Sequence, residues 1–223
     1  MNRNYIIKHL AGSIFFFAVL FICAGRLDYW QGLVYVAIGF IMSVLHYTLL
    51  KPDKELLKER SKPGENTKKW DTIILGLSFV FTISMYVVAG LDSGRYHLSP
   101  DFSVSLYFAG FFLTVAGQLL FLTAQKQNKF FSSTVHIQKE RNHAVCDTGL
   151  YKLVRHPAYL GSIIQATGFP LLLGSVWSIL PASALVILFV ARTILEDKTL
   201  QNELEGYRQY SARVRYRLIP FVW

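Results

Sequence analysis

The stretch AYLGSIIQATGFPLLLGSVWSILPASALVILFVA, residues 158–191, contains 34 residues and no charge. As a single α-helix it would be about 50 Å long, whereas the hydrocarbon core of a bilayer is about 30 Å thick. Gly174-Ser175 is the natural break in this stretch. We therefore predict a helical hairpin in the membrane, with arms at Ala158–Leu173 and Trp177–Glu196.

The rest of the chain has the same apolar character. Of its 223 residues, 52% are hydrophobic and 17% are charged, whereas soluble domains have about 25% charged residues. The apolar content excludes an intrinsically disordered chain. The presence of only two cysteines, Cys23 and Cys146, excludes a disulfide scaffold. These proportions predict a polytopic membrane protein.

Four further segments have the length and composition of membrane spans. They are Leu10–Ala24, Trp30–Leu50, Thr72–Leu91 and Val104–Thr123. Together with the hairpin they predict an all-α fold with about six transmembrane helices. A cleaved signal peptide is an alternative for the first segment, although a small-x-small cleavage site is lacking there.

Lys and Arg are distributed unevenly between the two sides of these six helices. The termini, the loop between the second and third helices and the loop between the fourth and fifth carry 21 of them, and the other connections carry 2. The positive-inside rule therefore predicts that both termini and the two long loops are cytoplasmic. The net charge of +9 then reflects topology and attraction to anionic headgroups, so we expect no nucleic-acid partner. In the first long loop, Asp53–Arg60 is predicted to form a short surface helix.

Polar residues of the predicted cytoplasmic face concentrate in Gln125–Tyr159 and Arg192–Trp223. Because the hairpin begins and ends on the same side, these two regions should lie together. In the first region, Pro157 suits the first turn of a helix. His156 would then lie at an anion-attracting helix N-terminus, with Tyr159 one turn further on. The alternative is an interfacial Arg-His pair that snorkels beside the helix start.

Arg192 and Glu196 are four residues apart and would share a helix face. They could form a structural ion pair, or they could be charged groups that face a polar cavity, as intramembrane ionisable residues usually do. Gly161 and Gly168 are seven residues apart, so both would fall on one face and permit close helix packing.

Four potential metal ligands, His136, His143, Cys146 and His156, occur in one region. Their spacing matches no standard zinc pattern, so we predict no metal site. The sequence also has no P-loop, no G-x-S-x-G motif and no dinucleotide fingerprint, so serine-nucleophile chemistry has no support.

The segment DTGLYKLVRHPAYLG, residues 147–161, resembles the isoprenylcysteine carboxyl methyltransferase and phospholipid methyltransferase superfamily. The ending resembles it too, in the pattern Arg192-x3-Glu196…Glu203…Tyr207-x2-Tyr210…Pro220, and Asn128 and His143-x-Val145 fit its cofactor-loop region. The resemblance implies an integral membrane methyltransferase that uses S-adenosylmethionine, releases S-adenosylhomocysteine and takes a lipophilic acceptor from the bilayer.

The resemblance divides the chain in two. Residues 1–124 would hold four transmembrane helices and the basic cytoplasmic loop 51–70. Residues 125–223 would form the catalytic region, with a cofactor loop, the hairpin and a cytoplasmic C-terminal segment that binds the cofactor. We expect membrane lipids as partners and no obligate protein partner.

Roles for individual residues are also implied by the resemblance. The cofactor-binding residues would be His143, Val145, Gly149, Tyr151, His156, Pro157, Tyr159 and Glu203. Asn128 and Arg192 would bind the acceptor, and Arg192 and Glu196 would be catalytic. If the acceptor is an isoprenylcysteine-like carboxylate, Arg192 would orient it. If the acceptor is a lipid amine, Glu196 could take its proton.

Two features depart from the methyltransferase pattern. Asp197 stands where family members often have a second glutamate after the one matched to Glu196. The tail Val214–Pro220 also resembles membrane sterol reductases, which share the Arg-His-Pro-x-Tyr element and use NADPH. One alternative is therefore an NADPH-dependent enone reductase whose phosphate contacts would be Lys152, Arg213, Arg215 and Arg217. The other alternative is a non-catalytic lipid-binding membrane protein.

Overall fold

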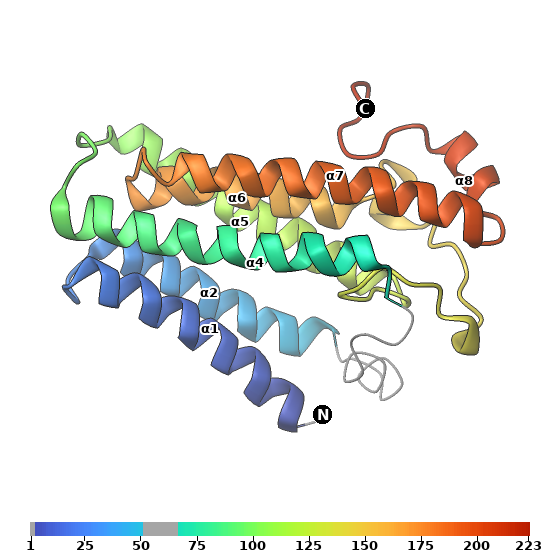
Figure 1. Ribbon diagram of the computed structural model, residues 1–223, viewed down its shortest axis with the longest axis horizontal. Helices are drawn as coiled ribbons and strands as arrows, with labels where there is room; N and C mark the ends of the chain where they lie inside the picture. The colour runs from blue at the N-terminus through green and yellow to red at the C-terminus, as the bar shows by residue number, and fades with distance from the viewer. Residues whose placement is uncertain (1–2, 51–66) are drawn as a thin grey trace.

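The structure is a computed structural model that describes residues 3–50 and 67–223 (Figure 1). All regular elements in these ranges are helical, as predicted. The long helices are α1 (Arg3–Ala24), α2 (Trp30–Leu50), α4 (Lys69–Ala89), α5 (Val104–Gln127), α6 (Pro157–Leu173) and α7 (Ile179–Glu203). The short elements are the π-helix η1 (Gly90–Tyr96), the 3-10 helices η2 (Lys139–Arg141) and η3 (Gly149–Lys152), and α8 (Tyr207–Arg213). The helix predicted at Asp53–Arg60 lies outside the described residues.

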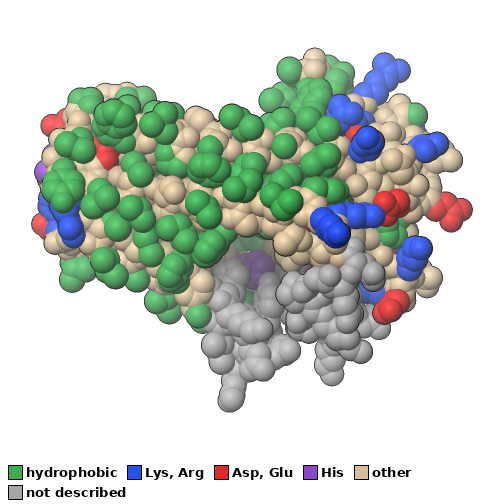
Figure 2. Space-filling view, in the orientation of Figure 1, with side chains coloured by type: hydrophobic (Ala, Val, Ile, Leu, Met, Phe, Trp, Pro, Cys, Tyr) green, Lys and Arg blue, Asp and Glu red, His purple; other side chains and the backbone are tan. Residues whose placement is uncertain are grey.

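The six long helices run roughly along the longest axis of the molecule (Figure 1). Within the described ranges, four helices are long and apolar enough to cross a membrane: Trp30–Leu49, Lys69–Tyr96, Val104–Gln127 and Ile179–Glu203. Leu10–Ala24 is a shorter apolar helix. Hydrophobic side chains cover the middle of the visible face, and Lys and Arg gather mainly at the end that carries α8 (Figure 2). The prediction of an all-α membrane protein is therefore confirmed.

The predicted hairpin is formed by α6 and α7, and its break lies at Gly174. This residue caps α6 with φ +67°, in the left-handed region that favours glycine. α7 continues to Glu203, seven residues beyond the predicted arm. The uncharged run ends at Ala191, but the helix continues beyond it. Asp197 is buried in this extension and accepts a hydrogen bond from Arg217 of the C-terminal segment.

Close packing between α5 and α6 follows from glycines on both helices. A Cβ on Gly161 would lie 2.6 Å from the carbonyl oxygen of Gly117, and a Cβ on Gly168 would lie 2.9 Å from that of Gly110. The predicted small-residue face of α6 therefore meets a matching face on α5, with the same spacing of seven residues. This contact fixes the start of α6 against the end of α5, where the polar loops begin.

A buried carboxylate ties the hairpin tip to η1 at the other end of the molecule. Asp92 is 2% exposed. It accepts hydrogen bonds from the backbone N–H of Ser99 at 2.8 Å and from the hydroxyls of Ser99 and Ser175 at 2.6 and 2.5 Å. These bonds anchor the hairpin tip at Ser175 to η1 and to the segment that follows it.

Candidate active site

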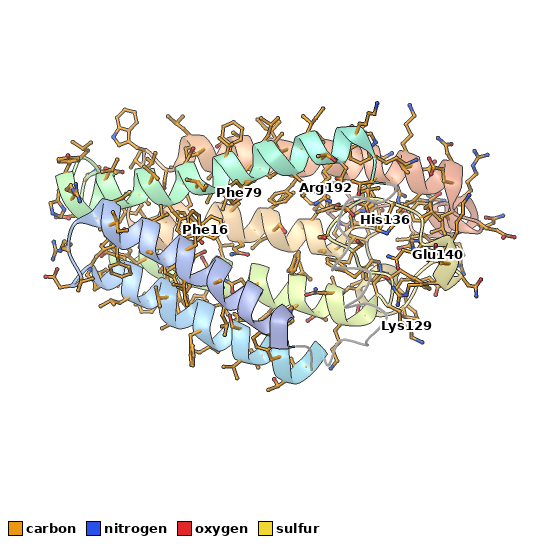
Figure 3. All side chains as sticks on the ribbon, turned by 60° about the horizontal axis from the view of Figure 1, so that its bottom comes forward. Phe16, Phe79, Lys129, His136, Glu140 and Arg192 are labelled. Atoms are coloured by element: carbon orange, nitrogen blue, oxygen red, sulfur yellow. The ribbon has the colours of Figure 1, made fainter. Side chains whose placement is uncertain are left out.

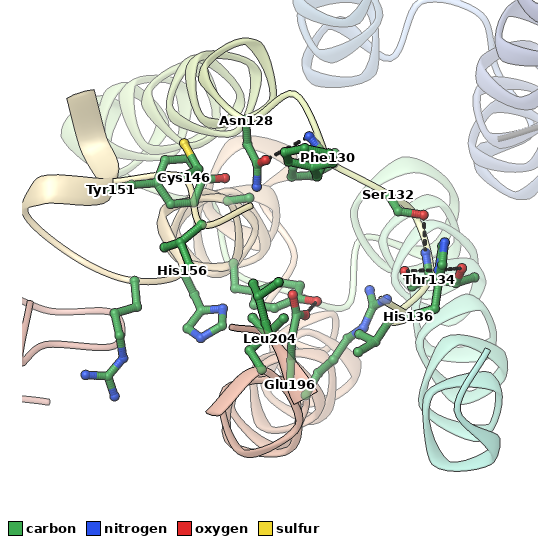
Figure 4. A pocket seen from close by; sticks show the side chains of 18 of the residues that line it. Asn128, Phe130, Ser132, Thr134, His136, Cys146, Tyr151, His156, Glu196 and Leu204 are labelled. Atoms are coloured by element: carbon green, nitrogen blue, oxygen red, sulfur yellow. Dashed lines mark hydrogen bonds between the residues drawn. The ribbon is translucent and has the colours of Figure 1, made fainter. Parts of the chain in front are cut away.

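A cavity of about 330 Å³ lies where α5, α6 and α7 meet the polar loops. Figure 3 shows Arg192 and His136 in this part of the molecule, away from Phe16 and Phe79 in the helical body. Eight of the predicted site residues line the cavity: Asn128, His143, Val145, Tyr151, His156, Tyr159, Arg192 and Glu196. In Figure 4, Tyr151 and His156 lie across the cavity from Thr134 and His136, with Glu196 between the two sides.

Three predicted site residues do not line the cavity. Gly149 has φ +55° and packs against the side-chain amide of Gln127, so it shapes a turn. Pro157 is the buried first residue of α6. Glu203 forms an ion pair with Lys68 at 2.6 Å, in which both side chains are about one third or more exposed (32% and 42% for Lys68 and Glu203).

Tyr159 connects α6 to the charged residues of α7. Its hydroxyl donates a hydrogen bond to Oε2 of Glu196. Its ring stacks on His156, with centroids 5.8 Å apart, and the Cζ atom of Arg192 lies 5.3 Å from its centroid. The Arg-His-Pro turn and the Arg192/Glu196 face are therefore brought together around one cavity.

Arg192 has a partner that the sequence spacing did not indicate. Its Nε donates to Oδ1 of Asp71 at 2.7 Å and its Nη2 donates to Oδ2 at 3.2 Å. Nη2 also donates to the carbonyl oxygen of Ser133 at 2.7 Å. Within the described residues there is no ion pair between Arg192 and Glu196, so that alternative is wrong. The buried pair with Asp71 fixes the guanidinium, and its Nη1 forms no hydrogen bond with another described residue.

Asp197 is a second buried carboxylate, and it organises the Arg-His-Pro turn. It accepts bidentate bonds from Arg155 at 2.7 and 3.0 Å and a bond from Arg217 Nε at 3.0 Å. The hydroxyl of Tyr207 donates to it at 3.0 Å, and Nε2 of His156 lies 3.4 Å away. From the sequence, Asp197 was identified only as a departure from the methyltransferase pattern. Adjacent helical residues point about 100° apart, so Glu196 faces the cavity while Asp197 faces the turn.

Backbone hydrogen bonds extend this connection to the C-terminal segment. The N–H groups of Arg155 and His156 donate to the carbonyl oxygens of Tyr216 and Arg217, both at 2.9 Å. The Tyr210 hydroxyl donates to the carbonyl oxygen of Tyr151 at 2.7 Å. Burial raises the pKa of this hydroxyl above its ordinary value, so it stays a donor at neutral pH. The C-terminal segment is thus an integral wall of the cavity.

Phe130 and His143 form an aromatic wall on the loop that follows α5. Their rings stack with centroids 4.6 Å apart. Burial, helped by nearby His136 and Arg141, lowers the pKa of His143 to about 4, so its ring is neutral at pH 7. The Gln138 N–H donates to Nδ1 of His143 at 3.3 Å, which puts the proton of the neutral ring on Nε2.

Four candidate metal ligands line this cavity: His136, His143, Cys146 and His156. They do not converge, because the described residues contain no group of three or more His, Cys, Asp or Glu side chains that could hold a metal ion. The cavity instead combines aromatic faces, a carboxylate and a fixed guanidinium. That combination suits an organic cation together with an anionic group.

Comparison with known proteins matches the same part of the chain. The model of the isoprenylcysteine carboxyl methyltransferase (ICMT) family matches residues 108–202. A protein-S-isoprenylcysteine O-methyltransferase from Schizosaccharomyces pombe is 29% identical over 164 residues, which cover 65% of this chain and 69% of that protein. The chain spans 56% to 58% of the length of further curated relatives of this kind.

Two other matches concern the fold and the alternative function. The solved structure of a eukaryotic intramembrane Ras methyltransferase ICMT has a TM-score of 0.52 with 19% sequence identity, and the match covers 100% of this chain and 88% of that one. The all-helical fold is therefore shared. A Delta(14)-sterol reductase from Mus musculus is 35% identical over 81 residues, which cover 34% of this chain and 19% of the reductase.

Proposed function

We propose that the chain is a membrane methyltransferase of the isoprenylcysteine carboxyl methyltransferase family, because the model of that family matches residues 108–202. It would transfer a methyl group from S-adenosylmethionine to a lipophilic, isoprenylcysteine-like acceptor. The observation that carries this proposal is the convergence of His156, Tyr159, Arg192 and Glu196 on one cavity. The cavity lies at the polar end of an apolar helical bundle. A charged cofactor would therefore enter from the aqueous side and a lipophilic acceptor from the bilayer.

The residues that line the cavity fit the cofactor by their chemistry. S-adenosylmethionine would supply an electrophilic methyl group on a sulfonium. The stacked rings of Phe130 and His143 offer a flat surface for a base. The carboxylate of Glu196, which lines the cavity, suits a cation. Val145, Tyr151 and His156 complete the proposed cofactor wall, whereas Gly149 and Pro157 shape its turns and Glu203 lies outside it. Asn128 also lines the cavity and is assigned to the acceptor together with Arg192.

Arg192 is the group that we assign to the acceptor. Its guanidinium donates three hydrogen bonds, two to Asp71 and one to the carbonyl oxygen of Ser133, so it is oriented before the acceptor binds. An acceptor carboxylate is already a nucleophile and needs alignment with the methyl group more than it needs a base. Exclusion of water by the buried aromatic lining would further favour the transfer.

The hydrogen bond from Tyr159 to Glu196 favours O-methylation over N-methylation. The bond places a donor on Oε2 of Glu196, so this oxygen is less free to take a proton from an amine. Removal of a proton from an amine is therefore a poorer role for Glu196 than electrostatic complementarity to the sulfonium. We propose a carboxylate acceptor for this reason.

We further propose six membrane crossings, with both termini and the active site in the cytoplasm. α1 and α6 would complete the four longer spans. The excess of Lys and Arg at the end that carries α8 supports this orientation (Figure 2). Residues 1–124 would then form a membrane scaffold, and residues 125–223 would form the catalytic region.

Ligand binding separates this proposal from its alternatives. The purified protein in nanodiscs is titrated by calorimetry with S-adenosylhomocysteine and with NADPH, and methyl-ester formation on N-acetyl-S-farnesylcysteine is measured with radiolabelled S-adenosylmethionine. We expect binding of S-adenosylhomocysteine and methyl-ester formation. Binding of NADPH alone would establish the reductase, which is not favoured because the matching reductase segment is short. Binding of neither would establish a non-catalytic protein.

A further inference from the structure

A second cavity, of about 540 Å³, lies between α1, α2, α4, α5 and α6 in the apolar body of the bundle. α1 and α2 diverge from the other long helices toward the end that carries α8 (Figure 1). Phe121 lines both this cavity and the candidate active site, and it packs edge-on against Phe131 with centroids 5.5 Å apart. We call the second space the intramembrane cavity.

Polar side chains line the intramembrane cavity although the helices around it are apolar. Gln118 and Gln125 of α5 are seven residues apart and share one helix face, and Gln165 of α6 joins them. Polar groups within a membrane segment are costly unless they face other protein groups or a functional cavity. Gln118 is half-buried, and its amide forms no hydrogen bond with another described residue.

Two tyrosines form a rigid floor beside these amides. The hydroxyls of Tyr35 and Tyr86 are 2.6 Å apart and both side chains are buried. Their rings pack on Phe169 with centroid distances of 5.1 and 4.9 Å, and Tyr35 also interacts with the side chain of Gln165. The polar floor is therefore organised before any ligand binds, so binding would cost little ordering.

The charge of the lining restricts what could bind. Among the described residues that line the intramembrane cavity there is no Asp, Glu, Lys or Arg, and His46 is its one histidine. A charged headgroup would find no Asp, Glu, Lys or Arg counter-ion among these described lining residues, and burial of an unpaired charge is strongly unfavourable. The side-chain amides present donors and acceptors together, and Phe16, Phe17 and Leu122 offer apolar surface.

We propose that the intramembrane cavity binds a neutral lipid whose hydroxyl or carbonyl group hydrogen-bonds to Gln118 and Gln165. This site is distinct from the proposed methyl-acceptor site, because an acceptor carboxylate requires a cation such as Arg192. The inference does not depend on methyl transfer, since it follows from the lining of the cavity alone.

The test uses the full chain in phosphatidylcholine nanodiscs with a long-chain fatty alcohol that carries a photoreactive diazirine in its tail. We expect cross-links on α1, α2 or α5 peptides that line the intramembrane cavity. The double variant Gln118→Leu/Gln165→Leu should weaken specific labelling about fivefold or more, as the loss of two hydrogen bonds predicts. The matched control is Gln31→Leu, which removes a glutamine near Tyr107 outside the cavity lining and should label like the wild type.

Three further results bear on the proposal. Gln118→Leu alone changes a half-buried side chain, so reduced labelling by that variant would support the site even if the double variant failed to fold. Equal labelling by the fatty acid with the same tail would overturn the inference of a neutral ligand. Displacement of the alcohol by N-acetyl-S-farnesylcysteine would make the cavity part of the acceptor site and overturn a separate one, whereas methyl transfer itself would be unaffected by either result.

Discussion

Arg155 and Asp197 form a bidentate ion pair with distances of 2.7 and 3.0 Å, and both side chains are at least nine-tenths buried. The pair joins Arg155, which lies two residues before α6, to Asp197 of α7. Nη1 of Arg155 also donates to the carbonyl oxygens of Val214 and Arg215 at 2.8 and 3.0 Å. One guanidinium therefore holds three parts of the chain together at the wall of the cavity.

Asp197→Asn should destabilise the protein strongly. The substitution removes the negative charge opposite Arg155 and Arg217 and leaves a buried guanidinium without compensation, which costs about 3–5 kcal/mol. Thermal unfolding in detergent should show a large drop in midpoint, together with weaker binding of S-adenosylhomocysteine.

The control for this variant is Asp147→Asn. Asp147 pairs with Arg213 at 3.1 Å, but those side chains are 46% and 69% exposed. An exposed ion pair contributes about 0–1 kcal/mol, so the midpoint should hardly move. Equal effects of the two substitutions would show that burial of the Asp197 pair has no energetic importance.

Arg192→Lys should weaken acceptor binding and leave cofactor binding intact. An ammonium keeps the charge but cannot hold Asp71 through two nitrogens and present a further donor to the acceptor. We expect the KM for N-acetyl-S-farnesylcysteine to rise about tenfold, which corresponds to about 1.4 kcal/mol. Calorimetry with S-adenosylhomocysteine provides the check, and loss of that binding would place Arg192 at the cofactor instead.

Glu196→Gln distinguishes the two kinds of acceptor. The amide oxygen can still accept the hydrogen bond from Tyr159, so the local geometry is preserved. If the acceptor is a carboxylate, kcat should fall by less than about tenfold, because the removal of a general base typically costs about 100-fold or more. Single-turnover methyl transfer measures this step, and a loss of the larger size would assign proton transfer to Glu196.

The hairpin and its break were predictable because their cause is local. A long uncharged run exceeds the bilayer thickness, and Gly174 is the residue that can adopt the turn. The convergence of His156 with Arg192 was predictable as well, since both ends of a hairpin return to the same side. The sequence alone could therefore indicate which regions meet at the site.

The partners of the buried charges were not predictable from local spacing. Helical periodicity suggested Arg192 with Glu196, but Arg192 pairs with Asp71, 121 residues away, because packing of α4 on α7 brings the two together. Glu203 shares the helix face of Glu196, yet it does not line the cavity and its carboxylate pairs with Lys68. Such pairings depend on tertiary packing, which one sequence does not specify.

His143 should make the stability of the protein depend on pH between about 6.5 and about 4. The pKa of His143 is lowered to about 4 in the folded protein, whereas an unfolded histidine has a pKa of about 6.5. In this window the unfolded chain binds a proton that the folded protein does not, so stability falls as the pH falls. His143→Gln should reduce the slope of unfolding midpoint against pH, measured from pH 7.5 to 4.5. An unchanged slope would contradict the burial of a neutral ring.

Gly161→Ala should disrupt the contact that positions the start of α6. The new Cβ would lie 2.6 Å from the carbonyl oxygen of Gly117 and 2.8 Å from the backbone nitrogen of Phe121, and neither backbone atom can move without separating the helices. Overpacking of this kind costs about 1–3 kcal/mol, and the shift of α6 should also lower methyl-transfer activity.

The matched control is Gly76→Ala in α4, where nothing lies within 4 Å of the added carbon. There the higher helix propensity of alanine should stabilise the protein by up to about 1 kcal/mol. Unfolding midpoints of the two variants therefore move in opposite directions if the α5–α6 contact supports the site, and a stabilised Gly161→Ala variant with full activity would remove that contact from the mechanism.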